Sequence, residues 1–545
     1  MLVVVLCAEA PIQAQSDDVS TVEVGRQLIH RMGCAGCHTI GIPAFSGLGR
    51  SGSDLRRIAA KTNQRWALDF VMAPREMRPT TWMPGFLDES GREEARAIVA
   101  YLWDASQPID YPAAPDGDAD RGDALFHSIG CTACHLWDAD AGRDDDPDPT
   151  RLQGPNLAHL GDKVRADWLF AWLRDPKQYA PQARMPDLRL SEREAADLTA
   201  FLMQSRAPER EREALRAFDT DDVRAGREAI DLYGCYGCHT IAGFEERGKH
   251  ASEWTSAEGF EEHGILGLPD FGLSANELRA IRSAIADASI EEPSGRRAAL
   301  VEGRKLLGRY NCRGCHLIEG RGRAIGADVE DVGLLPPDLN GEGSRVNPAW
   351  LAMYLADPGA VRLRSWLATD MPTFGFSSEE VRLLVAYFAA LEDEELEIAP
   401  ESPPSKRSIA LGREAFDLMP CGSCHPYGAE AVEALDLDVA SLGPALEIAS
   451  RRLRYGWIAS WIADPQSWTP GTRMPTFFVP TKQGTFSSPF AGLIDEPLLA
   501  ESTSRMLEHV GSVEEVAAFI DDGPAMIEAI RDYVWSLKET PGNGD

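Results

Sequence analysis

The stretch that decides the fold reads GRKLLGRYNCRGCH and spans residues 303–316. It begins with a glycine, continues with paired apolar residues, and ends in two cysteines separated by two residues and followed directly by a histidine. The chain repeats this pattern five times, and we number the copies 1 to 5 in chain order. A short amphipathic helix is therefore expected to lead into each CxxCH motif. The motifs occupy residues 34–38, 131–135, 235–239, 312–316 and 421–425, and a glycine lies nine residues before each first cysteine.

The chemistry of a CxxCH motif explains its spacing. Two thiols about one helical turn apart add to the two vinyl groups of one haem, and the adjacent histidine binds the iron. The thiols are Cys34 and Cys37, Cys131 and Cys134, Cys235 and Cys238, Cys312 and Cys315, and Cys421 and Cys424, and the histidines are His38, His135, His239, His316 and His425. A zinc ribbon would bring two CxxC elements close in sequence, whereas successive motifs lie 77 to 109 residues apart. A thioredoxin-like motif would not recur in this way, and disulfides would leave the histidines unexplained. We therefore predict five covalently bound haem c groups, each with its iron.

A Met-Pro pair follows the motif in four of the copies. An aromatic pair at i, i+4 spacing precedes it, as in Trp168 and Trp172, and an Asp-Pro pair ends this expected helix in three of the four. A single methionine is usually a core residue. Methionines at one place in a repeat instead indicate thioether ligands of the haem iron. They are Met83, Met185, Met371 and Met474, 49 to 59 residues beyond the first cysteine of their copies.

Copy 3 breaks this rule. No methionine lies between His239 and Cys312, and Leu268 stands before the proline at the ligand position. Leucine cannot bind iron, so this haem takes another ligand or keeps an open site. We favour His263, because its longer connection to His239 reaches the far side of the haem more easily. His250 and an open iron are the alternatives.

Leading helix, CxxCH, aromatic helix, Met-Pro loop and closing helix together resemble the class I (mitochondrial-type) cytochrome c domain. The resemblance implies an all-α fold of five tandem domains, each a small helical unit around a covalently bound haem. The expected ranges are a possible signal segment at 1–19 and domains at 20–107, 113–208, 218–292 (shortened, without the Met ligand), 293–395 and 404–541 (with an insertion). In this family a Gly-Pro carbonyl often steadies the proximal histidine. Gly154-Pro155 and Gly443-Pro444 match, Pro336-Pro337 matches in part, and copy 1 has no clear counterpart.

Composition limits the partners and the compartment. The 545 residues include 54 Lys and Arg against 86 Asp and Glu, a formal net charge of −32. This charge argues against a nucleic-acid partner and suits redox protein partners with basic docking surfaces. The short apolar run within residues 1–19 is typical of a secretory signal and is too short to span a bilayer. Since haem attachment in this family takes place outside the cytoplasm, we expect an exported protein, periplasmic or otherwise extracytoplasmic.

Haems with His and Met ligands exchange single electrons and leave no position for a substrate. We therefore expect an electron carrier between redox partners of a respiratory or related chain. An open iron in copy 3 would instead favour a haem enzyme that the other haems supply with electrons. The insertion in copy 5 would suit a fixed cytochrome subunit of a membrane respiratory complex or a filament. The sequence sets no oligomeric state.

Overall fold

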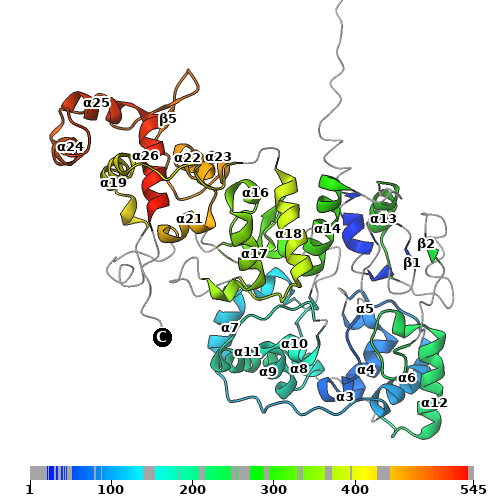
Figure 1. The fold of residues 1–545 in the computed structure, drawn as a ribbon. Coiled ribbons are helices and arrows are strands. Elements are labelled where there is room, and N and C mark those ends of the chain that lie inside the picture. The colour runs from blue at the N-terminus through cyan, green and yellow to red at the C-terminus, as the bar shows by residue number, and fades with distance from the viewer. Residues whose placement is uncertain are drawn as a thin grey trace, which may run out of the picture. The chain divides into compact units, whose positions relative to one another are not determined.

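The computed structural model (Figure 1) describes residues 21–22, 24–29, 32–34, 39–40, 42, 45, 52–78, 81–87, 89–138, 154–181, 183–207, 215–246, 253–254, 271–287, 294–327, 329, 335–361, 371–392, 396–425 and 442–537. Within these residues the chain is helical apart from turns, loops and short strands of two residues each. The all-α fold expected from the sequence is confirmed. The chain divides into two compact units: unit 1 is Met1–Cys315 with Gly322–Asp328, and unit 2 is His316–Arg321 with Val329–Asp545.

Unit 1 contains copies 1 to 3 and the first part of copy 4. Its helices are α3 (Ile58–Lys61), α4 (Gln64–Met72), α5 (Pro74–Met77), α6 (Arg92–Asp104), α7 (Ala119–Ser128), α8 (Leu160–Lys163), α9 (Ala166–Arg174), α10 (Pro176–Tyr179), α11 (Glu192–Gln204), α12 (Thr220–Leu232), α13 (Ala275–Asp287), α14 (Gly295–Tyr310) and α15 (Cys312–Cys315). Strands β1 (Thr39–Ile40) and β2 (Glu253–Trp254) pair in parallel. Residues 24–29, before the first motif, are also helical.

Copy 2 shows how a leading helix meets a closing helix. Helix α7 crosses α11 so closely that a Cβ on Gly122 would clash with the carbonyl oxygen of Asp197. The Arg121 guanidinium bonds the Asp197 carboxylate at the same crossing (2.9 Å). Phe126 and Leu198 have no exposed surface and belong to the apolar cluster between the helices. The glycine nine residues before the motif is therefore the contact point of the two helices.

The aromatic helices follow the sequence prediction. Trp168 and Trp172 stack on one face of α9, with ring centroids 5.2 Å apart. Helix α9 ends at Arg174, the side chain of Asp175 caps the next short helix, and Pro176 begins α10. Trp66 and Phe70 on α4 stack in the same way. The predicted placement of both aromatic residues on one helix face is confirmed.

Unit 2 contains the rest of copy 4 and copy 5. Its helices are α16 (Glu342–Arg345), α17 (Pro348–Ala356), α18 (Ser378–Leu391), α19 (Lys406–Leu418), α21 (Ala449–Arg452), α22 (Tyr455–Ala463), α23 (Pro465–Trp468), α24 (Ala500–Leu507), α25 (Val513–Asp521) and α26 (Gly523–Ser536). Strands β5 (Val479–Pro480) and β6 (Phe486–Ser487) pair antiparallel, and β3 (Leu317–Ile318) and β4 (Arg321–Gly322) follow the fourth motif.

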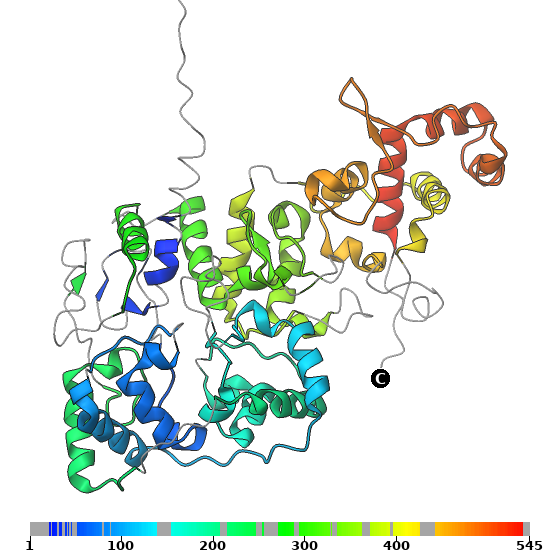
Figure 2. The ribbon, with the colours of Figure 1, turned by 180° about the vertical axis from the view of Figure 1, so that it is seen from behind.

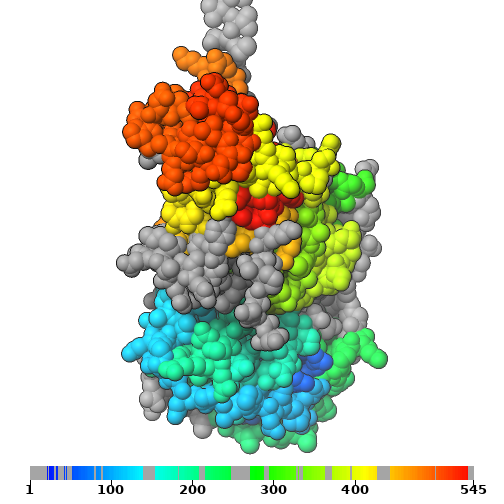
Figure 3. Space-filling view, turned by 60° about the vertical axis from the view of Figure 1, so that its left-hand side comes forward, coloured from blue at the N-terminus to red at the C-terminus, as the bar shows by residue number. Residues whose placement is uncertain are grey.

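The insertion of copy 5 includes β5, β6, α24 and α25. In the space-filling view, α24 and α25 form an orange-red lobe on the surface (Figure 3). Met506 and Ile520 of this lobe are fully buried against Leu411 of α19 and Ala529 of α26. The insertion is therefore packed onto the helix pair that closes copy 5. None of the helices in the described part of the chain is both long and apolar enough to cross a membrane.

Copies 1 and 3 pack differently from the consecutive units that the sequence predicts. Helix α6, which closes copy 1, packs along α12, which leads copy 3, and both ribbon views show the two side by side (Figures 1 and 2). The leading residues 24–29 of copy 1 pack instead on α13, the closing helix of copy 3. Leu28 and Ile29 share one buried cluster with Ile281 and Ala284.

Candidate haem sites

Each described CxxCH motif forms a single turn directly after its leading helix. The turns are η3 (Cys131–Ala133), η5 (Cys235–Gly237), α15 and η10 (Cys421–Ser423). A residue with positive φ precedes three of them: Gly130 (90°), Gly234 (64°) and Asn311 (55°). None of the nine cysteines that the structure describes forms a disulfide bond. Both thiols of these motifs thus lie on one turn, as thioether attachment requires. Cys37 and His38 lie outside the described residues.

The motif histidines are oriented by backbone carbonyls. Nδ1 of His135 contacts Pro155 O (2.7 Å), Nδ1 of His316 contacts Pro337 O (2.8 Å), and Nδ1 of His425 contacts Pro444 O (2.8 Å). A carbonyl only accepts, so Nδ1 of the neutral ring carries the proton and Nε2 keeps a lone pair that can bind iron. Burial lowers the pKa of His135, which favours this neutral form. The expected contact between proximal histidine and Gly-Pro loop is confirmed in copies 2, 4 and 5.

A glycine lies against the imidazole in this arrangement. A Cβ on Gly154 or Gly443 would clash with the ring of His135 or His425. Copy 1 has no Gly-Pro pair, as the sequence indicates, but its Gly52-Ser53 loop has this geometry. Its contact, however, is with His239 of copy 3: Nδ1 lies 2.8 Å from Ser53 O. A serine in place of the proline hid this loop in the sequence.

Two of the predicted methionine ligands are held by tryptophan. The Trp172 indole N–H donates to Sδ of Met185 (3.0 Å), and the Trp461 indole N–H donates to Sδ of Met474 (2.8 Å). These tryptophans are the second members of the aromatic pairs, so the aromatic helix positions the sulfur. In copy 1 this place is taken by Phe70, which has no N–H to donate.

The roles of the four methionines as axial ligands stay predictions. Met83 and Met371 also lie among the described residues, whereas His250, His263 and Leu268 lie outside them.

Three cationic side chains lie over the aromatic helices of unit 1. The sequence analysis did not predict them. Lys61 lies 4.6 Å from the ring centroid of Trp168, Lys163 lies 4.7 Å from that of Trp66, and Arg78 lies 5.9 Å from that of Trp66. Among the described residues neither lysine pairs with a carboxylate. Burial lowers the pKa of Lys61 to about 8 and that of Lys163 well below its usual value. Partly buried cations without an acidic partner call for an anionic ligand.

Unit 2 has a related arrangement. The Arg452 guanidinium lies over the ring of Trp350 (5.4 Å to its centroid). The buried Nε1 atoms of Trp350 and Trp457 have no hydrogen-bond partner among the described residues. A haem carries two carboxylates, which can accept from indole N–H groups and pair with cations. The donor set at the aromatic helices therefore fits haem carboxylates, just as the motif thiols and the neutral histidines fit its vinyl groups and its iron.

Comparison with known families agrees with this geometry. The family model described as Cytochrome c matches three segments, residues 22–106, 119–206 and 300–392. The chain carries repeated cytochrome c domains. No curated protein and no solved structure matches it significantly. Cytochrome c domains hold covalently bound haem c, whose iron exchanges single electrons. The matched segments contain copies 1, 2 and 4. The boundaries predicted for all five domains, and the count of five, stay predictions.

Proposed function

We propose that the chain is a five-haem c-type cytochrome that passes electrons from haem to haem and exchanges them with redox proteins outside the cytoplasm. One haem is bound at each CxxCH motif through its two thiols and its histidine. The protein's own contribution is to fix the distance between the haems and to tune each iron through its ligands and surroundings.

The contact between two attachment motifs of unit 1 carries this proposal. Asn311, next to Cys312, has its Nδ2 3.3 Å from Ala133 O and 3.2 Å from Sγ of Cys134. A Cβ on Gly314, within the fourth motif, would clash with Ala133 O. The turns that would each carry a haem therefore touch. Haems joined to these turns by thioether bonds are held close together, as electron transfer between them requires.

The first and third motifs also lie near each other. Burial raises the pKa of Cys34 to about 12, and the nearby thiol of Cys238 adds to the shift. Four motifs are therefore arranged in two neighbouring pairs. A carrier with a single isolated haem per domain would not need such pairs, so their presence supports a relay within the chain.

The charge supports protein partners with basic docking surfaces, and covalent haem attachment supports an extracytoplasmic location. The formal net charge of −32 excludes the haem carboxylates, which add further negative charge. Association with a basic partner is expected to slow as salt is raised, because screening shortens the range of the attraction.

Export of the chain in a host with cytochrome c maturation, followed by intact-mass measurement and a reductive titration, tests the proposal. We expect a mass increase of five haems and uptake of five electrons per chain. Stopped-flow oxidation by a small basic cytochrome should then drain all five with a salt-dependent rate. A chain that holds fewer than five haems would contradict the proposal. So would a chain in which the basic cytochrome oxidises only some of the haems. A Cys131→Ser/Cys134→Ser variant, which lacks one attachment site, is the control for the haem count.

A further inference from the structure

Copy 2 defines how a cytochrome c domain of this chain holds the segment around its histidine. The N–H of Gly154 donates to Cys134 O (2.7 Å), and the N–H of Leu157 donates to Leu136 O (2.9 Å). These bonds flank the histidine and tie the motif to the loop that leads into the aromatic helix and the methionine. In copy 5 the N–H of Gly443 makes the first of these bonds within its own copy (2.7 Å).

In copy 3 the same bonds are made by copy 1. The N–H of Gly52 donates to Cys238 O (3.0 Å), and the N–H of Leu55 donates to Thr240 O (2.9 Å). Relative to the histidine, both acceptors have the positions of their counterparts in copy 2, and the donors have the same three-residue spacing. The loop beside His239 thus leads into α4 and onward to Met83, all parts of copy 1.

The converse pairing occurs at the first motif. Thr39 directly follows His38, and β1 pairs with β2 of copy 3 through the partners Thr39 with Glu253 and Ile40 with Trp254. The chain that runs beside the first motif therefore comes from copy 3. The exchange is reciprocal.

The leading helix of each of these two copies also packs on the closing helix of the other. A Cβ on Gly226 of α12 would clash with Ala97 O of α6, and a Cβ on Gly25 would clash with Ala280 O of α13. These are the crossings that Gly122 makes within copy 2 and that Gly412 makes with Ala529 O within copy 5. Each half of copy 1 therefore finds its standard partner in copy 3.

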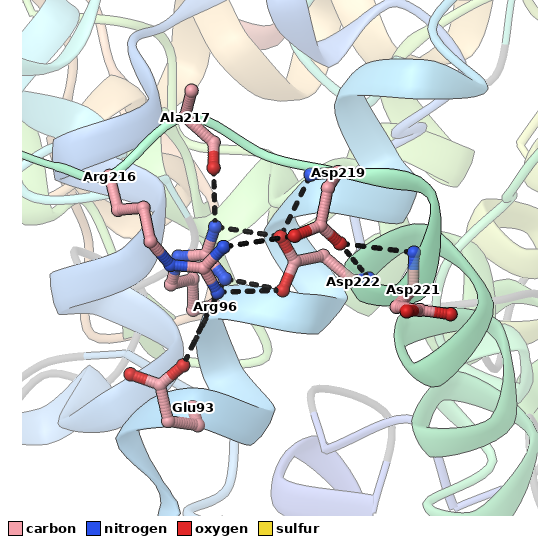
Figure 4. A network of polar contacts seen from close by, with 7 residues as sticks. All are labelled: Glu93, Arg96, Arg216, Ala217, Asp219, Asp221 and Asp222. Atoms are coloured by element: carbon pink, nitrogen blue, oxygen red, sulfur yellow. Dashed lines mark hydrogen bonds and ion pairs between the residues drawn. The ribbon is translucent and has the colours of Figure 1, made fainter.

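A buried ion pair fastens α6 to α12 (Figure 4). Nη2 of Arg96 donates to Oδ2 of Asp222 (2.7 Å) and to Ala217 O (2.8 Å), and Nη1 bonds Oδ1 of the same carboxylate. Arg216 approaches that carboxylate from the copy 3 side (3.0 Å). The side chains of Arg96 and Asp222 are only 5% and 12% exposed, so the pair belongs to the interior of this joint domain.

The Met-Pro loop of copy 1 also lies on copy 3. Phe86, three residues beyond Met83, packs on Tyr233 with ring centroids 5.6 Å apart. Tyr233 lies two residues before Cys235, at the end of α12. The segment that carries Met83 is thereby brought to the turn that carries the third motif.

We propose that copies 1 and 3 exchange halves, so that Met83 is the axial ligand of the haem attached to Cys235 and Cys238. The inference rests on the proposed haem attachment at each motif and adds which segment completes which site. The haem without a methionine is then the one attached to Cys34 and Cys37, because Leu268 stands at the ligand position of the copy 3 half. The family match to residues 22–106 is compatible with this exchange. That match concerns the order of the elements along copy 1. The exchange concerns the copy against which each of these elements packs.

Removal of single haems from the mature protein tests the assignment. We would compare Cys34→Ser/Cys37→Ser with Cys235→Ser/Cys238→Ser by near-infrared magnetic circular dichroism of the methionine-to-iron charge-transfer bands. Four methionine-ligated haems are expected in the parent protein. Loss of the third motif should lower the band intensity by about a quarter, and loss of the first should leave it unchanged. Cys131→Ser/Cys134→Ser is the matched control, because it should remove about a quarter under either assignment. The reverse result for the first and third motifs would overturn the exchange.

A cross-linking measurement covers the case in which a variant lacking a haem does not fold. Arg26 pairs with Asp287 of α13 (2.6 Å), so Arg26→Lys introduces an amine that a zero-length carbodiimide reagent can join to that carboxylate. We expect the peptide with residue 26 to be joined to the peptide with Asp287. A cross-link to α6 of its own copy would refute the exchange. This result does not depend on the number of haems, so a haem count below five would contradict the proposed function and leave the exchange to stand or fall on the cross-link.

Discussion

The Arg96–Asp222 pair yields the most quantitative prediction, the effect of Arg96→Met. The substitution keeps the apolar stem and removes the hydrogen bonds to Asp222 and Ala217 O. Removal of one partner of a buried charge pair costs about 3–5 kcal/mol. Arg216 still contacts Asp222, so we expect the lower limit, about 3 kcal/mol. This loss corresponds to amide exchange about 100-fold faster in the affected helices.

Hydrogen exchange with mass spectrometry measures this loss locally, which suits a chain of several domains. Peptides covering 92–104 and 220–232 should both lose protection, although the substitution lies in the first alone. Arg224→Met is the matched control, because Arg224 on α12 pairs only at the surface, where it is 66% exposed. We expect it to leave protection unchanged. If α12 keeps its full protection in Arg96→Met, the two helices do not support each other and the reasoning is refuted.

The same pair predicts a dependence on acid. The Arg96 guanidinium holds the pKa of Asp222 well below its usual range. A carboxyl group whose pKa is lower in the folded state contributes its full stability above its pKa in the unfolded state, about 3.9. This stability is lost as the pH falls through the pKa of the folded state. The parent protein should therefore lose protection of α12 steeply below about pH 4, and Arg96→Met should lose less over that range, having already lost the interaction.

Four further variants test the domain geometry and the haem environment. Gly226→Ala forces a methyl group against Ala97 O and should destabilise α12 by about 1–3 kcal/mol in native-state hydrogen exchange. Gly308→Ala on α14, where nothing lies within 4 Å, should stabilise its helix by about 0.5–1 kcal/mol, and equal effects would contradict the crossing. Trp172→Phe removes the hydrogen bond to Sδ of Met185, which draws electron density from the sulfur, and should lower the potential of that haem by about 20–60 mV in spectroelectrochemistry. Lys61→Met removes a partly buried cation and should lower a haem potential by about 40 mV for each kcal/mol of attraction lost. An unchanged potential would show that Lys61 does not interact with the haem carboxylates.

The repeat predicted much of what the structure shows. The glycine before each motif, the stacked aromatic residues and the Gly-Pro contact to histidine all follow from local sequence, because each depends on residues a fixed number of positions apart. The cations over the tryptophans could not be found in this way. Lys61 lies over a ring of copy 2, and Lys163 lies over a ring of copy 1. Such contacts depend on how the copies pack together, and the spacing of residues within one copy does not encode this packing.

The exchange of halves was hidden for a related reason. The leading helices of copies 1, 2, 3 and 5 each present a glycine to a carbonyl of a closing helix, so the sequence specifies the kind of crossing and leaves the choice of partner open. Charge at one position distinguishes the partners. Asp222 lies four residues before Gly226, and the corresponding residue of copy 1 is Thr21. Consecutive pairing would place the buried Arg96 opposite this threonine, without a carboxylate. In the exchanged pairing Arg96 contacts Asp222. Arg279 is the residue of α13 that corresponds to Arg96, and it is exposed. Because an unpaired buried cation costs several kcal/mol and an exposed one costs little, this difference favours the exchanged arrangement.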